Sequence, residues 1–139
     1  MNEHRFPLRV YYEDTDLAGI VYYANYLKFI ERGRSEYVRA LGIDQVELKE
    51  GRGLVFAVRR VEADYLSPAR FDDRLEVLTA IGQIGGARLV MAQRVMRGEE
   101  ALFTAQVTLV LMSLEGRPAR IPADIRARLE EAGGRPAER

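Results

Sequence analysis

The chain has 139 residues and no cysteine, and its 21 basic and 21 acidic residues give a formal net charge of zero. The lack of cysteine excludes disulfides, thiol nucleophiles and thiolate metal sites, and it fits a reducing compartment. The zero charge argues against a general nucleic-acid-binding protein, because no sequence-wide basic field exists to hold a phosphate backbone. The length predicts a single domain over residues 1–139 with a sizeable core.

Membrane and targeting signals are not evident in the sequence. The first seven residues lack the apolar core of a signal peptide, and no run approaches the ~18 apolar residues that a membrane helix needs. We therefore expect a soluble, cytoplasmic protein without membrane insertion.

The first half of the chain predicts a strand, a turn and one long helix. Residues 6–12 alternate with a period of two, which is typical of a strand with one buried face. Residues 13–18 are rich in turn formers, and Gly19 permits a tight backbone turn. From Asn25 to Leu41 the period becomes helical, and the wide apolar arc indicates a helix largely wrapped by a sheet. We expect residues 43–53 to be a polar connection.

The second half of the chain predicts mostly strands. Apolar alternation predicts strands over residues 54–65, 74–84, 87–96 and 102–112, with a hairpin turn at residues 98–100. Residues 122–132 predict a short helix with Pro122 near its first turn, and the tail from residue 133 is expected to fray. Strands that cluster after a single helix favour an α+β fold with an antiparallel sheet over alternating βαβ units.

Few side chains can carry nucleophilic or metal chemistry. The only histidine is His4, which we expect to be exposed at a mobile N-terminus, so a Ser-His-Asp triad and a histidine-rich zinc site are both excluded. No serine lies in a G-x-S-x-G motif. The sequence thus predicts no metal and no cofactor, and the reactive group of a hydrolase would be a carboxylate.

The carboxylates of Asp14 and Asp16 are the obvious candidates. One interpretation is a solvated loop in which either side chain accepts a hydrogen bond from its own backbone. Tyrosines crowd both sides of the pair, at positions 11, 12, 22, 23 and 26, and they favour a cleft that buries a ligand. The following helix would offer free amides to a developing oxyanion. A carboxylate opposite could attack a carbonyl directly or draw a proton from water, and the residues do not separate these routes.

The stretch from Tyr11 to Tyr37, YYEDTDLAGIVYYANYLKFIERGRSEY, closely resembles the signature of the hotdog-fold acyl-CoA thioesterases. The similarity is to the branch named for 4-hydroxybenzoyl-CoA thioesterase, which includes the Tol–Pal-associated acyl-CoA thioesterases. The segment 63–73, ADYLSPARFDD, resembles the same branch. The resemblance implies a hotdog fold, in which a five-stranded antiparallel sheet wraps around one long helix. It also implies an acyl-CoA substrate and assembly into homodimers or homotetramers with active sites between subunits.

The resemblance also implies roles for particular residues. The essential aspartate of the family falls on Asp16, and the backbone amide that polarises the carbonyl falls on Tyr23, while Asp14 would form the turn. Many Tol–Pal-associated relatives have histidine where this chain has Tyr23, a difference that leaves a backbone role intact. Ser67 and Arg70 would face the substrate from a neighbouring subunit, and Arg70 and Arg88 would contact phosphates. The full set of expected substrate contacts is Gly19, Val21, Tyr22, Asn25, Ser67, Arg70 and Arg88.

Three hypotheses follow for the function. The first is an acyl-CoA thioesterase with Asp16 as nucleophile or general base. The second is a non-catalytic hotdog module that binds an acyl thioester or a protein partner, and the intact aspartate and glycine turn argue against it. The third is a related dehydratase, which ranks last because such relatives rely on a histidine and this chain offers only His4.

Overall fold

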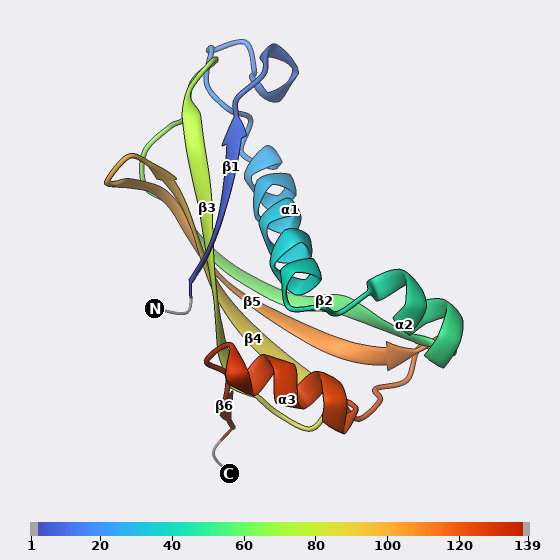
Figure 1. Ribbon diagram of the computed structural model, residues 1–139. Coiled ribbons are helices and arrows are strands. Elements are labelled where there is room, and N and C mark those ends of the chain that lie inside the picture. Colours follow the sequence, from blue (N-terminus) through green and yellow to red (C-terminus); the bar gives the residue numbers. More distant parts are fainter. Residues whose placement is uncertain (1–2, 138–139) are drawn as a thin grey trace.

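A curved sheet and three helices form the molecule, which a computed structural model describes for residues 3–137 (Figure 1). The main strands are β1 (His4–Arg9), β2 (Leu54–Tyr65), β3 (Arg74–Ile84), β4 (Arg88–Arg97) and β5 (Glu100–Ser113). The helices are α1 (Asn25–Ala40), α2 (Gln45–Arg52) and α3 (Ala123–Glu131), and a 3-10 turn, η1, spans Tyr12–Asp14. The short strand β6 (Arg135–Pro136) completes the set.

The sheet is antiparallel in its main part. The strand order is β1-β3-β4-β5-β2, and each neighbouring pair in this order is antiparallel. The short strand β6 instead pairs in parallel with the end of β3. The predicted α+β fold, with five main antiparallel strands, one long helix and a short C-terminal helix, is confirmed.

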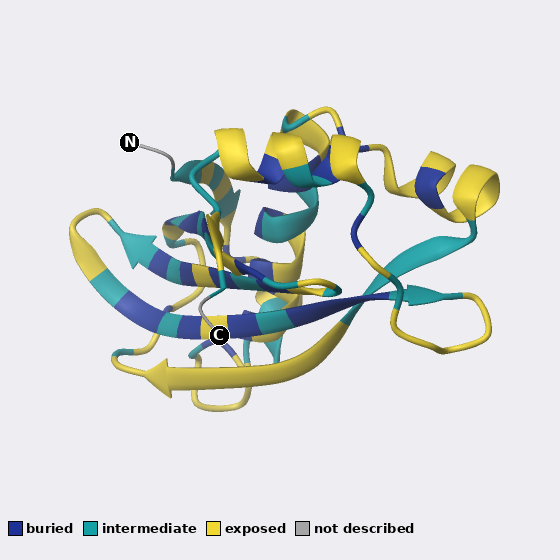
Figure 2. Cartoon of the chain, turned by 90° about the horizontal axis from the view of Figure 1, so that it is seen from below, coloured by how far each residue is buried: buried dark blue, intermediate teal, exposed yellow. Residues whose placement is uncertain are grey.

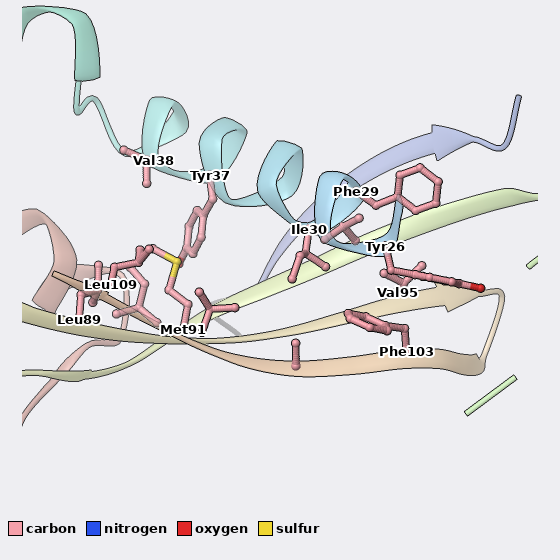
Figure 3. Close-up of a cluster of buried hydrophobic side chains, with 14 of the residues drawn as sticks. Tyr26, Phe29, Ile30, Tyr37, Val38, Leu89, Met91, Val95, Phe103 and Leu109 are labelled. Carbon is pink, nitrogen blue, oxygen red and sulfur yellow. The ribbon is translucent and has the colours of Figure 1, made fainter. Parts of the chain in front are cut away.

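The core lies between α1 and the concave face of the sheet (Figure 3). The buried residues of α1 follow the spacing of one helical face: Tyr26, Phe29, Ile30, Gly33, Tyr37 and Val38. They pack toward side chains of β4 and β5 that include Met91, Val95 and Phe103. At Gly33 a Cβ atom would come within 2.5 Å of Val77 Cγ1, so the glycine lets β3 approach the helix closely.

The structure corrects two predictions about local structure in the first half of the chain. Residues 43–53 are not merely a connection, because α2 forms there, with the Asp44 carboxylate accepting hydrogen bonds from the amides of Val46 and Glu47. Gly53 ends this helix in the left-handed conformation, with φ 66°. The first strand ends at Arg9 instead of residue 12, because the chain turns into η1.

The predictions for the two ends of the chain are also corrected. His4 is not an exposed, mobile residue, because it belongs to β1 and stacks on Tyr37 with ring centroids 5.1 Å apart. The tail is not wholly frayed, since Arg135 and Pro136 pair with β3. Residues 138 and 139 lie outside the described part of the chain.

Strand β2 forms a free edge of the sheet in the single chain. Helix α1 packs mainly on β1, β3 and β4, whereas β2 is contacted by α2. Figure 2 shows β2 as an exposed border of the sheet, and Val58, Val61 and Tyr65 are 48%, 38% and 48% exposed. Within residues 3–137, no helix is long and apolar enough to cross a membrane.

Candidate active site

The loop between β1 and α1 is closed by hydrogen bonds to Asp14. Its Oδ2 accepts the amide hydrogen of Tyr11 at 2.7 Å, which closes η1 and confirms the turn-forming role predicted for this residue. Its carbonyl oxygen accepts two more bonds, from the amide of Tyr22 at 3.0 Å and from Asn25 Nδ2 at 2.9 Å. The loop is therefore tied to the first turn of α1.

The next carboxylate, Asp16, sits in a second tight turn. Its Oδ1 accepts the amide hydrogen of Ala18 at 2.9 Å, and its carbonyl accepts that of Gly19 at 2.9 Å. Gly19 has φ +80°, a conformation that a glycine adopts without strain. Asp16 therefore accepts a hydrogen bond from its own loop backbone, as the interpretation of a solvated loop predicts. Its second carboxylate oxygen, Oδ2, has no hydrogen-bond partner among residues 3–137.

Asp16 also lines a pocket of about 390 Å³. The remaining walls are mostly aromatic and apolar and come from the loop, from α1 and from the end of β2: Ile20, Val21, Tyr22, Tyr23, Tyr26, Tyr65, Leu66, Ser67 and Pro68. Tyr26 stacks on Phe103 with ring centroids 5.1 Å apart and meets Tyr65 edge-on at 5.5 Å. The predicted cleft therefore exists, although Tyr11 and Tyr12 are exposed outside it.

The N-terminus of α1 faces this pocket at Tyr23. The helix begins at Asn25, and its cap residue Ala24 provides no side-chain hydrogen bond. Within residues 3–137, the amides of Tyr23 and Ala24 have no hydrogen-bond acceptor. Such free amides attract negative charge. The hydroxyl of Tyr65 donates to the Tyr23 carbonyl at 3.0 Å and so holds this turn in place.

A polar network holds the opposite wall of the pocket. Asp73 Oδ2 accepts hydrogen bonds from Arg97 Nη1 at 2.7 Å and from the amide of Arg70 at 2.9 Å. Burial acts to raise the pKa of Asp73, but these two hydrogen bonds and the positive charges of Arg97 and Arg70 together outweigh it and leave the pKa below its ordinary value. The amide of Ala69 donates to the Tyr26 hydroxyl at 2.9 Å, and burial raises the pKa of that phenol.

The pocket brings together five of the residues predicted from the sequence: Asp16, Val21, Tyr22, Tyr23 and Ser67. Ser67 reaches it from the same chain, whereas the prediction placed this residue in a neighbouring subunit.

The other four predicted residues lie outside the lining of the pocket. Gly19 shapes the turn at Asp16, and Asn25 holds the Asp14 carbonyl. The backbone of Arg70 bridges to Ile20 while its side chain is exposed. Arg88 begins β4, at the end away from Arg97, so a strand of roughly 30 Å separates it from the pocket wall of the same chain.

Sequence reasoning missed several residues that shape the site. Tyr65, Leu66 and Pro68 line the pocket and lie in the segment 63–73. The resemblance of this segment to the family was the signal that could have identified them. Arg97 precedes a hairpin far along the chain, and no local pattern links it to Asp73. Residues 3–137 contain no group of three histidine, aspartate or glutamate side chains that could hold a metal ion.

Comparison with known proteins places the chain in a family. Residues 10–129 match the Thioesterase-like superfamily. The chain belongs to this superfamily, and its sheet wrapped around α1 is the hotdog fold.

Individual relatives match over most of their length. The chain is 41% identical over 127 residues to the acyl-CoA thioesterase YbgC of Haemophilus influenzae, covering 91% of this chain and 93% of that protein. It is 40% identical over 129 residues to the acyl-CoA thioester hydrolase YbgC of Escherichia coli O157:H7, covering 91% and 96%. A crystal structure of a probable thioesterase from Bartonella henselae superposes with a TM-score of 0.83 at 44% identity, covering 86% of this chain and 99% of that one.

Proposed function

We propose that this protein hydrolyses an acyl-CoA thioester to the free acid and CoA, with Asp16 as nucleophile or general base. The enzyme class, a thioester hydrolase, follows from the superfamily and from relatives at about 40% identity over most of the chain. One observation carries the proposed mechanism: the Asp16 carboxylate and the residue with a free amide at the start of α1, Tyr23, line the same pocket.

The chemistry follows from these two groups. The thioester carbonyl oxygen would accept hydrogen bonds from the free amides of Tyr23 and Ala24. Negative charge that develops on this oxygen would be stabilised by about 3 kcal/mol for each well-placed donor. The Asp16 carboxylate would then either attack the carbonyl carbon to form an anhydride, which water hydrolyses to the free acid and the restored carboxylate, or take a proton from a water that attacks the carbonyl carbon itself. In both routes the CoA sulfur leaves as a thiolate, and neither route needs a metal or a redox cofactor.

The walls of the pocket support an apolar acyl group. Tyr22, Tyr26 and Leu66 offer aromatic and aliphatic surface, and polar groups are few. The CoA portion would extend outward to basic residues, for which Arg70 is a candidate on the same chain. Arg88 would have to come from another copy of the chain, because it lies at the far end of β4.

Assembly and location complete the proposal. We expect a homodimer or homotetramer, and the exposed edge strand β2 supports self-association. A cytoplasmic location, with acyl-CoA as the partner and no nucleic acid, stays a prediction of the sequence.

The test is release of free thiol from a panel of short-chain, long-chain and aromatic acyl-CoAs. Wild-type protein should release CoA from at least one of them, and the Asp16→Asn variant should not. Tight binding of acyl-CoA by the wild type without thiol release would instead identify the non-catalytic binding module, which can share the same pocket and fold.

A further inference from the structure

Residues 68–73, between β2 and β3, form a short segment that joins the pocket to the rest of the fold. We call it the wall segment, because Pro68 lines the pocket. The next residue, Ala69, is completely buried. Its carbonyl accepts the amide hydrogen of Val21 at 2.8 Å, and its amide donates to the Tyr26 hydroxyl at 2.9 Å. The wall segment is therefore hydrogen-bonded both to the loop before α1 and to α1 itself.

The wall segment also reaches Asp16 through the backbone. Arg70 forms an antiparallel bridge with Ile20, and the Ile20 carbonyl accepts the amide hydrogen of Asp16 at 2.9 Å. A shift of the wall segment would therefore carry Ile20 with it and change where the Asp16 carboxylate lies in the pocket.

The guanidinium of Arg97, at the end of β4, holds the wall segment from the side away from Asp16. Its Nη1 donates to Asp73 Oδ2 at 2.7 Å and to the Pro68 carbonyl at 3.3 Å. Its Nη2 donates to Glu100 Oε1 at 2.9 Å, which fixes the direction of the guanidinium. Asp73 Oδ2 also accepts the amide hydrogen of Arg70 at 2.9 Å, so this carboxylate links the guanidinium to the backbone of the wall segment.

Two observations distinguish this arrangement from an ordinary surface ion pair, which contributes little to stability. The Arg97 and Asp73 side chains are only 34% and 23% exposed, and both bind backbone groups of the wall segment. Asp72 has φ 72° and is the one non-glycine residue with a positive φ in the part of the chain that the structure describes. A backbone conformation of this kind persists where its surroundings impose it. The contacts of the wall segment thus set its shape.

We propose that Arg97 is a positioning residue for the reaction, acting through Asp73 to hold the wall segment and, through that segment, Asp16. This inference rests on the proposed function and adds to it a residue that does not line the pocket. Misplacement of a reacting group by about 1 Å can cost about 100-fold in rate. Loss of the guanidinium should therefore lower kcat while KM changes little.

The kinetic test compares two arginines of β4. Arg97→Met removes the guanidinium but keeps an apolar stem, and kcat for acyl-CoA hydrolysis should fall about 10-fold with KM within about 3-fold of the wild-type value. Arg94→Met is the matched control, because Arg94 pairs with Glu3 at 2.8 Å, with side chains 40% and 28% exposed, and has no hydrogen bond to residues 68–73. The control should keep wild-type kcat. An Arg97→Met variant whose kcat stays within about two-fold of this control overturns the proposal.

A double-mutant cycle tests whether Arg97 acts through Asp73. Asp73→Asn removes the charge, while the asparagine Oδ1 can still accept the Arg70 amide hydrogen. If the two residues form one unit, the variant that carries both substitutions should lose no more kcat than Arg97→Met alone. Losses that multiply in the double variant would mean that the two residues act independently, which overturns this route.

Amide hydrogen exchange, followed by NMR, tests the positioning without any activity measurement. In Arg97→Met the buried amides of Val21 and Ala69 should exchange about 10-fold faster, while the amides in the middle of β4 and β5 keep their wild-type rates. Unchanged exchange at both positions overturns the proposal, even if kcat falls. Wild-type protein that hydrolyses no acyl-CoA defeats the proposed function, and the exchange rates then still decide whether Arg97 holds the wall segment.

Discussion

Replacement of Asp16 by asparagine separates the chemistry of the site from its folding. The Asp16 Oδ1 accepts the amide hydrogen of Ala18 at 2.9 Å, and the Oδ1 of an asparagine can accept the same bond. Because the side chain is exposed, we expect the free energy of unfolding to change by less than about 0.5 kcal/mol. The lost charge removes the nucleophile or base. General acid–base catalysis contributes about 10²–10⁴-fold, so the barrier should rise by about 3–5 kcal/mol.

The assay measures kcat and KM for one acyl-CoA by thiol release, together with urea unfolding of each variant. We expect kcat of Asp16→Asn to fall by at least about 100-fold while KM stays near the wild-type value. Asp14→Asn is the matched control, because it makes the same chemical change two residues earlier and an asparagine can keep the bond to the Tyr11 amide. A variant at position 16 that keeps more than about a tenth of wild-type kcat, equal to a loss below about 1.4 kcal/mol, would refute the reasoning. An equal loss in the Asp14→Asn control would refute it too.

Three other predictions concern a hydrogen bond beside the site, a close contact between α1 and β3, and a salt bridge on the surface. Tyr65→Phe removes the hydroxyl that donates to the Tyr23 carbonyl at 3.0 Å. We expect kcat to fall a few-fold, because one hydrogen bond contributes about 1 kcal/mol. An unchanged kcat would show that this bond does not position the Tyr23 amide. Gly33→Ala places a Cβ atom 2.5 Å from Val77 Cγ1 and should cost about 1–3 kcal/mol in urea unfolding, whereas Gly51→Ala meets only the flexible end of Glu47 and should cost nothing. The hydrogen bonds from Arg52 lower the pKa of Asp124 from 3.8 to about 2, so this pair stabilises the fold above about pH 4 and the stabilisation is lost as the pH falls through 2. Asp124→Asn should therefore lower the melting temperature at pH 7, and the difference from the wild type should shrink between about pH 4 and pH 2; a difference at pH 2 as large as that at pH 7 would contradict this origin.

Much of the fold could be predicted from the sequence because its signals are local. The helical spacing from Tyr26 to Val38 marks the buried face of α1, and the alternation in β3 and β5 marks the concave face of the sheet. Helix α2 was missed because its eight residues bury only Leu48 and show little apolar periodicity. The Asp44 cap was the available signal for its start.

Some residues of the site lie in one short sequence motif, and others are brought together only by the fold. Asp16 and Tyr23 stand in one motif, so the sequence alone could name them together. The wall held by Asp73 and Arg97 depends on contacts between residues 24 positions apart, which no local pattern reports. His4 was misjudged for a similar reason, since its partner Tyr37 belongs to a distant helix.

The hydrogen bonds that the Asp14 carbonyl receives from Tyr22 and Asn25 have a consequence for how this enzyme can diversify. Both bonds lie within one short, continuous segment, whereas part of the pocket wall that would face the acyl group, at Leu66 and Ser67, comes from the loop after β2. Substitutions at those two positions can change which acid is released without disturbing how the bond is broken. Selection can therefore act on preference and on reactivity through separate parts of the gene.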